Sequence, residues 1–109
     1  VRLNVALFEW VIENLCKNAV DAMGGVGVLV ISVQETSRYW CIDVADTGKG
    51  IDKRYFETVF APGYTTKKRG WGLGLSLARR IVVEYHSGSI FVKQSEINKG
   101  TIFRIELKK

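Results

Sequence analysis

The stretch ENLCKNAVDAM, residues 13–23, carries two asparagines within an apolar helical pattern. Its apolar residues recur at helical spacing, and the same spacing runs back to residue 3, which predicts one amphipathic helix over residues 3–23. Asn14 and Asn18 stand four residues apart and therefore share one face of this helix. Asparagine is a weak helix former whose amide needs partners in mid-helix. The pair therefore indicates a polar edge on a core-packing helix, facing either a ligand or solvent.

The remaining sequence predicts a second layer made of strands. Runs of β-branched and aromatic residues predict two antiparallel hairpins, with a second long helix between them. The order α-β-β-loop-α-β-β predicts an α+β fold in which helices cover one face of a mixed, mostly antiparallel sheet. Residues 47–71 show no sustained periodicity, and so long an irregular stretch in a small domain is usually functional. The expected elements are a hairpin at 26–33 and 38–46, a short helix near 52–59, a helix at 72–86 and a hairpin at 88–96 and 100–107.

The length and the cysteine pattern limit the class of protein. The chain has 109 residues, enough for one domain with a single core, and no apolar run approaches the roughly 20 residues that span a bilayer. We therefore expect a cytoplasmic domain that reaches a membrane only through other parts of its protein. Cys16 and Cys41 stand singly in apolar patterns, which favours free thiols over a zinc site or a disulfide.

The net charge of +5 raises the question of nucleic-acid binding. Part of the positive charge lies in the basic run at residues 67–69, directly before a glycine-rich segment, and the aromatic residues mostly fall at core-like positions. A basic run is a weak signal by itself, because solvated lysines are common on any protein surface. We therefore expect no nucleic-acid partner.

Two glycine-rich stretches stand at different places in the predicted fold. DTGKGI, residues 46–51, follows a strand, so that the Asp46 carboxylate could accept a hydrogen bond from the amino group of a ligand. GWGLGL, residues 70–75, enters a helix, and the free N–H groups and positive dipole of a helix start suit phosphate. This second stretch is neither a dinucleotide-binding fingerprint nor a Walker loop. Taken singly, each stretch also fits a turn or a flexible helix entry.

Together these motifs resemble the ATP-binding catalytic domain of sensor histidine kinases. That domain belongs to a superfamily shared with DNA gyrase, a heat-shock chaperone and the mismatch-repair ATPases. The resemblance covers almost the whole chain, and the motifs occur in the family's order, which makes it highly specific. The matching motifs are ENLCKNAVDAM as the asparagine box, DTGKGI as the first glycine box, VFAPGYTTK (59–67) as the phenylalanine box, GWGLGLSLARRIV (70–82) as the second glycine box and GTIFRI (100–105) as the glycine-threonine element.

The resemblance implies a Bergerat-type ATP-binding fold, which is an α/β sandwich, and a set of site residues. Asn18 is implied to bind Mg²⁺ and, with Lys67, to be catalytic. Asp46 is implied to accept from the amino group of adenine and to reject the carbonyl group of guanine. Residues 52–71 are implied to form a lid over the nucleotide. The implied ATP-binding residues are Asn14, Lys17, Asn18, Asp46, Gly48, Gly50, Ile51, Phe60, Thr65, Thr66, Lys67, Gly70, Gly72, Leu73, Gly74, Leu75 and Thr101.

The resemblance also implies what the domain works with. Residues 1–109 look like one catalytic domain, a fragment of a longer sensor kinase, and the family's usual strand before the first helix is expected to be missing. Such a kinase transfers the γ-phosphate of ATP to a histidine on its own separate dimerisation domain, acts as a homodimer, and serves a response regulator. The chain departs from the family pattern at Gly63 and Tyr64, which replace two phenylalanines of the lid, and at Asp21, where many relatives carry a basic residue.

The residue types at the predicted metal site bear on the reaction. The superfamily's hydrolases carry a glutamate one helical turn before the metal-binding asparagine, where this chain has Asn14, whose amide cannot act as a general base. Glu13 lies about 100° around the helix and points elsewhere. The pattern favours phosphoryl transfer to histidine, with an anti-sigma-type serine kinase and a nucleotide-sensing module without transfer activity as alternatives. His86, the single histidine, resembles a turn residue of the family and is not expected to be the phosphoacceptor.

Overall fold

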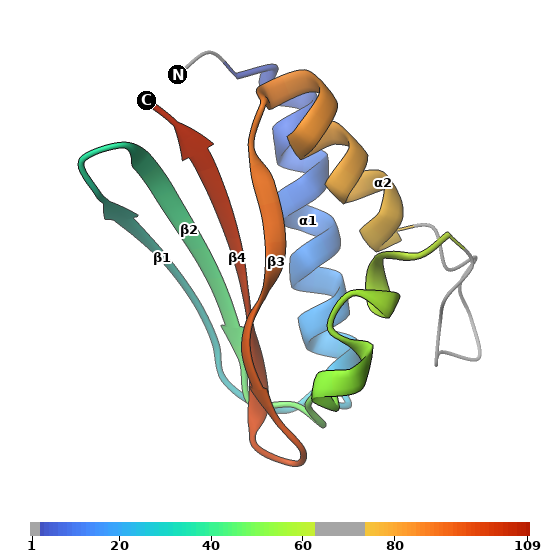
Figure 1. The fold of residues 1–109 in the computed structure, drawn as a ribbon. Helices are drawn as coiled ribbons and strands as arrows, with labels where there is room; N and C mark the ends of the chain where they lie inside the picture. The colour runs from blue at the N-terminus through green and yellow to red at the C-terminus, as the bar shows by residue number, and fades with distance from the viewer. Residues whose placement is uncertain (1–2, 63–73) are drawn as a thin grey trace.

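The computed structural model describes residues 3–62 and 74–109, and the order of their elements is the predicted one (Figure 1). The predicted short helix near residues 52–59 is present as two short 3-10 helices, and the second long helix changes to a π-helix before it ends. In chain order the elements are α1 (Val5–Ala22), β1 (Leu29–Glu35), β2 (Tyr39–Asp46), η1 (Lys53–Tyr55), η2 (Thr58–Phe60), α2 (Gly74–Arg80), the π-helix η3 (Ile81–Tyr85), β3 (Ser89–Glu96) and β4 (Gly100–Lys108).

Within the described residues the strands form one antiparallel sheet in the order β1-β2-β4-β3. Helices α1 and α2 lie against the same face of this sheet, which gives two layers (Figure 1). The core lies between the layers, where Phe8, Val11 and Leu15 of α1 belong to one buried cluster with Val44 of β2 and Phe103 of β4. The predicted α+β fold, with helices on one face of a mostly antiparallel sheet, is confirmed.

Helix α1 forms where its apolar spacing predicts. Its N-cap is Asn4, whose side chain accepts a hydrogen bond from the backbone N–H of Leu7 at 3.1 Å and so satisfies a free donor at the helix start. The helix ends before the glycine pair at residues 24–25. Like the other helices in the described part of the chain, it lacks the length and hydropathy of a membrane span. Its buried residues, three or four positions apart, are Phe8, Val11, Leu15 and Ala19.

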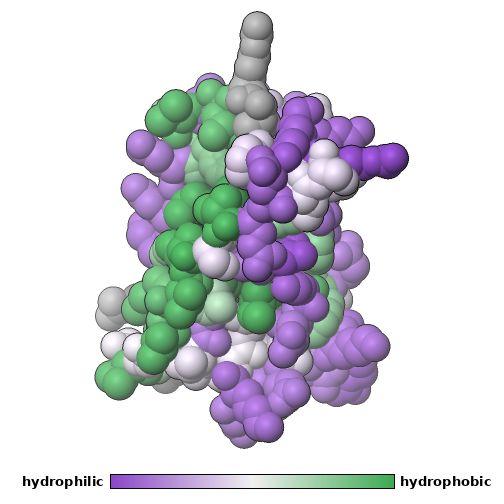
Figure 2. Space-filling view, turned by 90° about the vertical axis from the view of Figure 1, so that its left-hand side faces the viewer, coloured by the Kyte–Doolittle hydropathy of each residue, from purple (hydrophilic) through white to green (hydrophobic). Residues whose placement is uncertain are grey.

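Strand β1 is the edge of the sheet beside β2, and its exposed surface is hydrophobic. Val30, Ile31 and Val33 of this strand are each close to half exposed or more. The space-filling view of this side of the molecule shows a band of hydrophobic residues (Figure 2). An apolar edge of this kind is open to pairing with a further strand.

The second helix departs from the regular helix predicted over residues 72–86. Its described part begins at Gly74 and becomes π-helical at Ile81–Tyr85. His86 accepts a hydrogen bond at Nε2 from the backbone N–H of Asn4, at 3.0 Å, so its ring proton is on Nδ1 and donates to the carbonyl oxygen of Ile81 at 3.1 Å. The imidazole therefore ties the end of the second helix to the N-cap of α1.

Replacing His86 with alanine should destabilise the domain by about 2 kcal/mol, because it leaves two backbone groups without their partners. The variant also loses the edge-to-face contact of the imidazole with Phe8, whose ring centroid is 5.6 Å away. Urea denaturation of the wild type and His86→Ala measures the difference in free energy of unfolding. Since glutamine carries one donor and one acceptor group, His86→Gln should recover part of the loss. Equal urea midpoints for wild type and His86→Ala would show that the tie is not stabilising.

Candidate nucleotide-binding site

Part of the predicted site lies outside the described residues. This part comprises residues 63–71 of the predicted lid and residues 70–73 of the second glycine box, and it includes the candidate catalytic Lys67. The roles expected for these residues therefore remain predictions. The residues concerned are Thr65, Thr66, Lys67, Gly70, Gly72 and Leu73, together with Gly63 and Tyr64, which depart from the family pattern.

Asp46 is a buried carboxyl group at the end of β2. It is 8% exposed, and its Oδ1 accepts a hydrogen bond from the backbone N–H of Gly48 at 2.8 Å. Burial raises the pKa of Asp46, and the backbone N–H groups of Gly48 and Thr101 partly oppose that shift. Thr101 stands directly opposite Asp46 in the pairing of β2 with β4 and is also buried. A buried carboxyl group held by backbone donors in this way is a candidate for ligand recognition.

The loop DTGKGI, which begins with Asp46, is packed between the end of α1 and the turn that joins β3 to β4. The N–H of Lys49 donates to the carbonyl of Ala22 at 2.9 Å, and the N–H of Asn98 donates to the carbonyl of Lys49 at 2.8 Å. A Cβ added to Gly48 would lie 2.6 Å from the backbone of Ala22, and one added to Gly50, where φ is +78°, would collide with the backbone of residue 96. Both positions therefore require glycine because protein backbone packs closely there, and the approach of a nucleotide to these glycines stays a prediction.

One face of α1 connects this loop with the start of α2. Asn14, Asn18 and Ala22 stand at four-residue spacing and so share that face. At one end, a Cβ added to Gly74 would lie 2.8 Å from Oδ1 of Asn14, so the amide oxygen lies against the first residue of α2. At the other end, Ala22 contacts Gly48. Asn18 therefore lies on α1 between the level of the α2 start and the level of the loop after Asp46.

The side-chain amide of Asn14 has a fixed orientation. Its Nδ2 donates to the carbonyl oxygen of Trp10, one turn earlier in α1, at 3.1 Å. This bond turns Oδ1 toward Gly74 at the start of α2. The amide thus presents an oxygen to the site, and it has no group that could accept a proton from water as a general base.

Comparison with known proteins places this chain in a family. Residues 4–109 match the family described as "Histidine kinase-, DNA gyrase B-, and HSP90-like ATPase". The chain belongs to this family. Sporulation kinase C of Bacillus subtilis (strain 168) is 37% identical over 86% of the chain, and the sensor histidine kinase ZraS of Escherichia coli (strain K12) is 40% identical over 89%. The chain spans about a fifth of the length of these two relatives, at 22% and 20%.

Solved structures of histidine kinases have the same fold as this ATPase-family domain. The catalytic domain of histidine kinase ThkA is 32% identical and has a TM-score of 0.86, and the match covers 100% of this chain and 70% of the ThkA chain. A second structure, histidine kinase ThkA in complex with the response regulator protein TrrA, is 29% identical with a TM-score of 0.83 and matches 100% of this chain and 30% of its own. The identification as an ATP-binding catalytic domain of the histidine kinase type, made from the five motifs, is confirmed.

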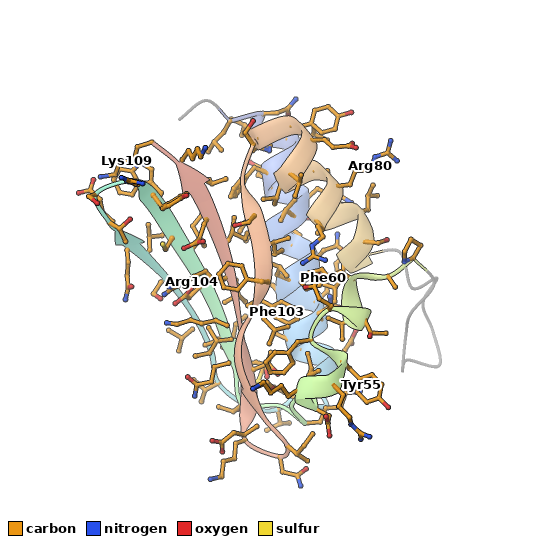
Figure 3. All side chains as sticks on the ribbon, in the orientation of Figure 1. Tyr55, Phe60, Arg80, Phe103, Arg104 and Lys109 are labelled. Carbon is orange, nitrogen blue, oxygen red and sulfur yellow. The ribbon has the colours of Figure 1, made fainter. Side chains whose placement is uncertain are left out.

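The remaining described residues of the predicted ATP site differ in their surroundings. Lys17 is exposed and lines a shallow groove with Cys16 and Val20. Phe60 is buried: its ring packs edge-to-face on Phe103, 6.1 Å between centroids, and Figure 3 shows both rings between η2 and the sheet. Phe60 therefore anchors the described part of the predicted lid to the core. Leu75 packs half-buried against the core.

The structure also brings to this site a residue that the sequence argument did not select. Ser95 of β3 accepts a hydrogen bond from the N–H of Ile51, at 2.7 Å, at the end of the first glycine box. Its hydroxyl oxygen is 2.8 Å from the hydroxyl oxygen of Thr101. The sequence does not indicate that this serine contacts Ile51 and Thr101, because the register of β3 determines the face of the strand on which the serine lies.

Proposed function

We propose that this chain is the catalytic domain of a sensor histidine kinase, which binds Mg-ATP and transfers the γ-phosphate to a histidine of a separate dimerisation domain. The observation that carries the proposal is one continuous face of α1. Asn14, at one end of this face, lies against the start of α2, and Ala22, at the other end, contacts the loop after Asp46. Adenine bound at Asp46 and phosphates bound at the start of α2 would lie at opposite ends of this face. Asn18, between these ends, is then the residue nearest the metal-binding phosphates.

The donor groups of α1 suit Mg²⁺. An amide oxygen is a hard ligand, and Mg²⁺ takes few protein ligands because phosphate oxygens and water complete its octahedral shell. We propose Asn18 as the protein ligand, with Asn14 beside it and its Oδ1 turned to the α2 start. When bound, Mg²⁺ neutralises negative charge on the phosphates.

The chain's own residues bind and orient the nucleotide. Asp46 accepts from the adenine amino group, and backbone N–H groups from residue 70 to the start of α2 hold the phosphates, with Lys67 as the cationic partner. The imidazole nitrogen of the acceptor histidine then forms a bond to the γ-phosphorus, the bond to the bridging oxygen breaks, and ADP leaves. Since Asn14 cannot activate water, transfer is favoured over hydrolysis. We propose that residues 1–109 form one domain and that residues 52–71, with Thr65 and Thr66, form its lid.

The partners of the full protein follow from the same proposal. A homodimer built by the dimerisation domain would present the acceptor histidine to this domain, and a response regulator would receive the phosphate, as the complex of ThkA with TrrA suggests by analogy. We propose that this occurs in the cytoplasm, where ATP and the regulator are available. Any attachment to a membrane would come from other parts of the full protein.

The proposal is tested by the magnesium dependence of nucleotide binding. Calorimetric titration with a non-hydrolysable ATP analogue should show binding that Mg²⁺ strengthens at least tenfold, which is about 1.4 kcal/mol. Asn18→Ala should remove this gain and leave binding in the absence of Mg²⁺ almost unchanged. Glu13→Ala, on an exposed position of the same helix, is the matched control and should behave as wild type. Binding that is equally tight with and without Mg²⁺ would contradict the metal-binding role.

A further inference from the structure

We propose that Ser95 is a positioning residue that turns the hydroxyl of Thr101 into a hydrogen-bond acceptor and so sets the purine specificity of the site. The inference rests on the proposed function, because it concerns how the same site distinguishes an amino group from a carbonyl group on a purine ring.

A β-bulge brings Ser95 to the site. Val92 of β3 pairs with Phe103 of β4 and faces the core, but the register shifts between Val92 and Gln94. The shift reverses which residues of the strand face the core. Without it Gln94 would face the core, but with it Ser95, opposite Thr101, does so. Bulges re-aim side chains in this way beside functional sites.

The hydroxyl of Ser95 meets three partners. The N–H of Ile51 donates to Oγ at 2.7 Å, the carbonyl oxygen of Gly100 is 3.0 Å from Oγ, and the hydroxyl oxygen of Thr101 is 2.8 Å from Oγ. These partners come from two different predicted motifs, the first glycine box and the glycine-threonine element. Ser95, which lies in β3, therefore connects the two motifs by hydrogen bonds.

Counting protons fixes the direction of each bond. A serine hydroxyl has one proton and two lone pairs. The N–H of Ile51 uses one lone pair, and the carbonyl of Gly100, which can only accept, uses the proton. The contact with Thr101 is then a hydrogen bond only if Thr101 donates to the second lone pair of Ser95. In this arrangement the single proton of the Thr101 hydroxyl is committed inside the protein, and its oxygen is left with lone pairs.

As a consequence, the part of the site that would face the purine ring carries hydrogen-bond acceptors. Thr101 lies opposite Asp46, on the same face of the sheet, and the Asp46 carboxylate is itself an acceptor. Two acceptors suit the amino group of adenine and oppose a carbonyl group at the same ring position. If Ser95 lost its hydroxyl, Thr101 could rotate and donate its proton, and the site would then accept a carbonyl group as well.

The test compares ATP with inosine triphosphate, whose purine carries a carbonyl group in place of the amino group. Dissociation constants for both nucleotides should be measured calorimetrically with the wild-type chain, Ser95→Ala and Ser95→Thr. Ser89→Ala, at the other end of β3 and opposite Glu106, is the matched control. We expect the wild type to bind ATP much more tightly than inosine triphosphate. The ratio of the two dissociation constants should fall at least tenfold in Ser95→Ala and stay unchanged in Ser95→Thr and Ser89→Ala.

The outcomes separate the inference from the proposed function. If Ser95→Ala weakens both nucleotides equally and keeps the preference for ATP, Ser95 is only structural and the inference is wrong, while the proposed function stands. If Ser95→Thr loses the preference too, side-chain shape and not the hydroxyl matters, and the inference is again wrong. If the folded wild type binds neither nucleotide, the proposed function fails and the inference fails with it.

Discussion

Asp46→Asn is expected to lower the affinity for ATP about 100-fold while leaving the free domain at least as stable as the wild type. The carboxylate supplies a charged hydrogen-bond acceptor for the adenine amino group, and such bonds contribute about 1.5–3 kcal/mol. The asparagine amide can turn an N–H donor toward the same amino group, which adds repulsion. The N–H of Gly48, which donates to Asp46 at 2.8 Å, can still donate to the amide oxygen of asparagine.

The stability of this variant follows from the raised pKa of Asp46. Because the folded-state pKa lies above the unfolded value of about 3.9, the stability that Asp46 contributes is complete below that value. It is lost as the pH rises through the folded-state pKa. At neutral pH the buried carboxylate therefore costs stability, and the uncharged amide removes this cost. The same shift predicts that wild-type ATP affinity falls on acidification, as Asp46 takes up a proton.

Calorimetric titration with an ATP analogue and thermal unfolding of the ligand-free domain at neutral pH check both halves of this prediction. Glu35→Gln makes the same chemical change at the opposite end of the β1–β2 hairpin, where Glu35 pairs with Lys109. It should leave ATP affinity unchanged. A large fall in melting temperature for Asp46→Asn, with ATP binding retained, would mean that Asp46 is a structural residue.

The parts of the site that the sequence predicted depend on local spacing. The four-residue spacing of Asn14 and Asn18 puts both on one face of α1 wherever that helix packs, and Asp46 follows from the end of a strand. The tie between His86 and Asn4 joins residues 82 positions apart, and the neighbours that require Gly48 and Gly50 are Ala22 and residue 96. Contacts of this kind leave no periodic signal, so only the folded chain reveals them.

Ser95 shows a second limit of sequence patterns. Strict alternation along β3 would put Gln94 with Val92 on the core face and turn Ser95 away from it. One extra residue at the bulge reverses this order, and nothing in the composition of the strand marks the bulge. The sequence pattern therefore predicts that β3 exists but assigns its last residues to the wrong face.

Arg104→Met should destabilise the domain by about 3–5 kcal/mol, because it leaves the buried carboxylate of Asp43 without its main partner. Asp43 is 7% exposed and stands directly opposite Arg104 in the pairing of β2 with β4. The guanidinium group of Arg104 (Figure 3) donates to both carboxylate oxygens, at 2.7 and 2.9 Å, and Lys93 lies 3.5 Å from one of them. Bidentate pairing of this kind is the strong form of an ion pair.

The dependence of stability on pH gives this prediction a distinct signature. The hydrogen bonds from Arg104 hold the pKa of Asp43 below its ordinary value. The wild-type pair therefore contributes stability above the unfolded pKa of about 3.9, and that contribution is lost as the pH falls through the folded-state pKa. In Arg104→Met only Lys93 still opposes the effect of burial, so the pKa of Asp43 should be higher than in the wild type and less stability should be lost as the pH falls.

Urea denaturation at neutral and mildly acidic pH measures both effects. Arg80→Met is the matched control, since Arg80 pairs with Glu84 at 2.9 Å on the surface, where the two side chains are 68% and 56% exposed. Exposed pairs contribute at most about 1 kcal/mol, so this control should unfold close to the wild-type midpoint at both pH values. Replacing both members of the buried pair, in Asp43→Leu/Arg104→Met, should recover much of the loss because no charge then remains buried. Equal destabilisation by Arg104→Met and Arg80→Met would show that the charge of Asp43 is solvated in the folded domain.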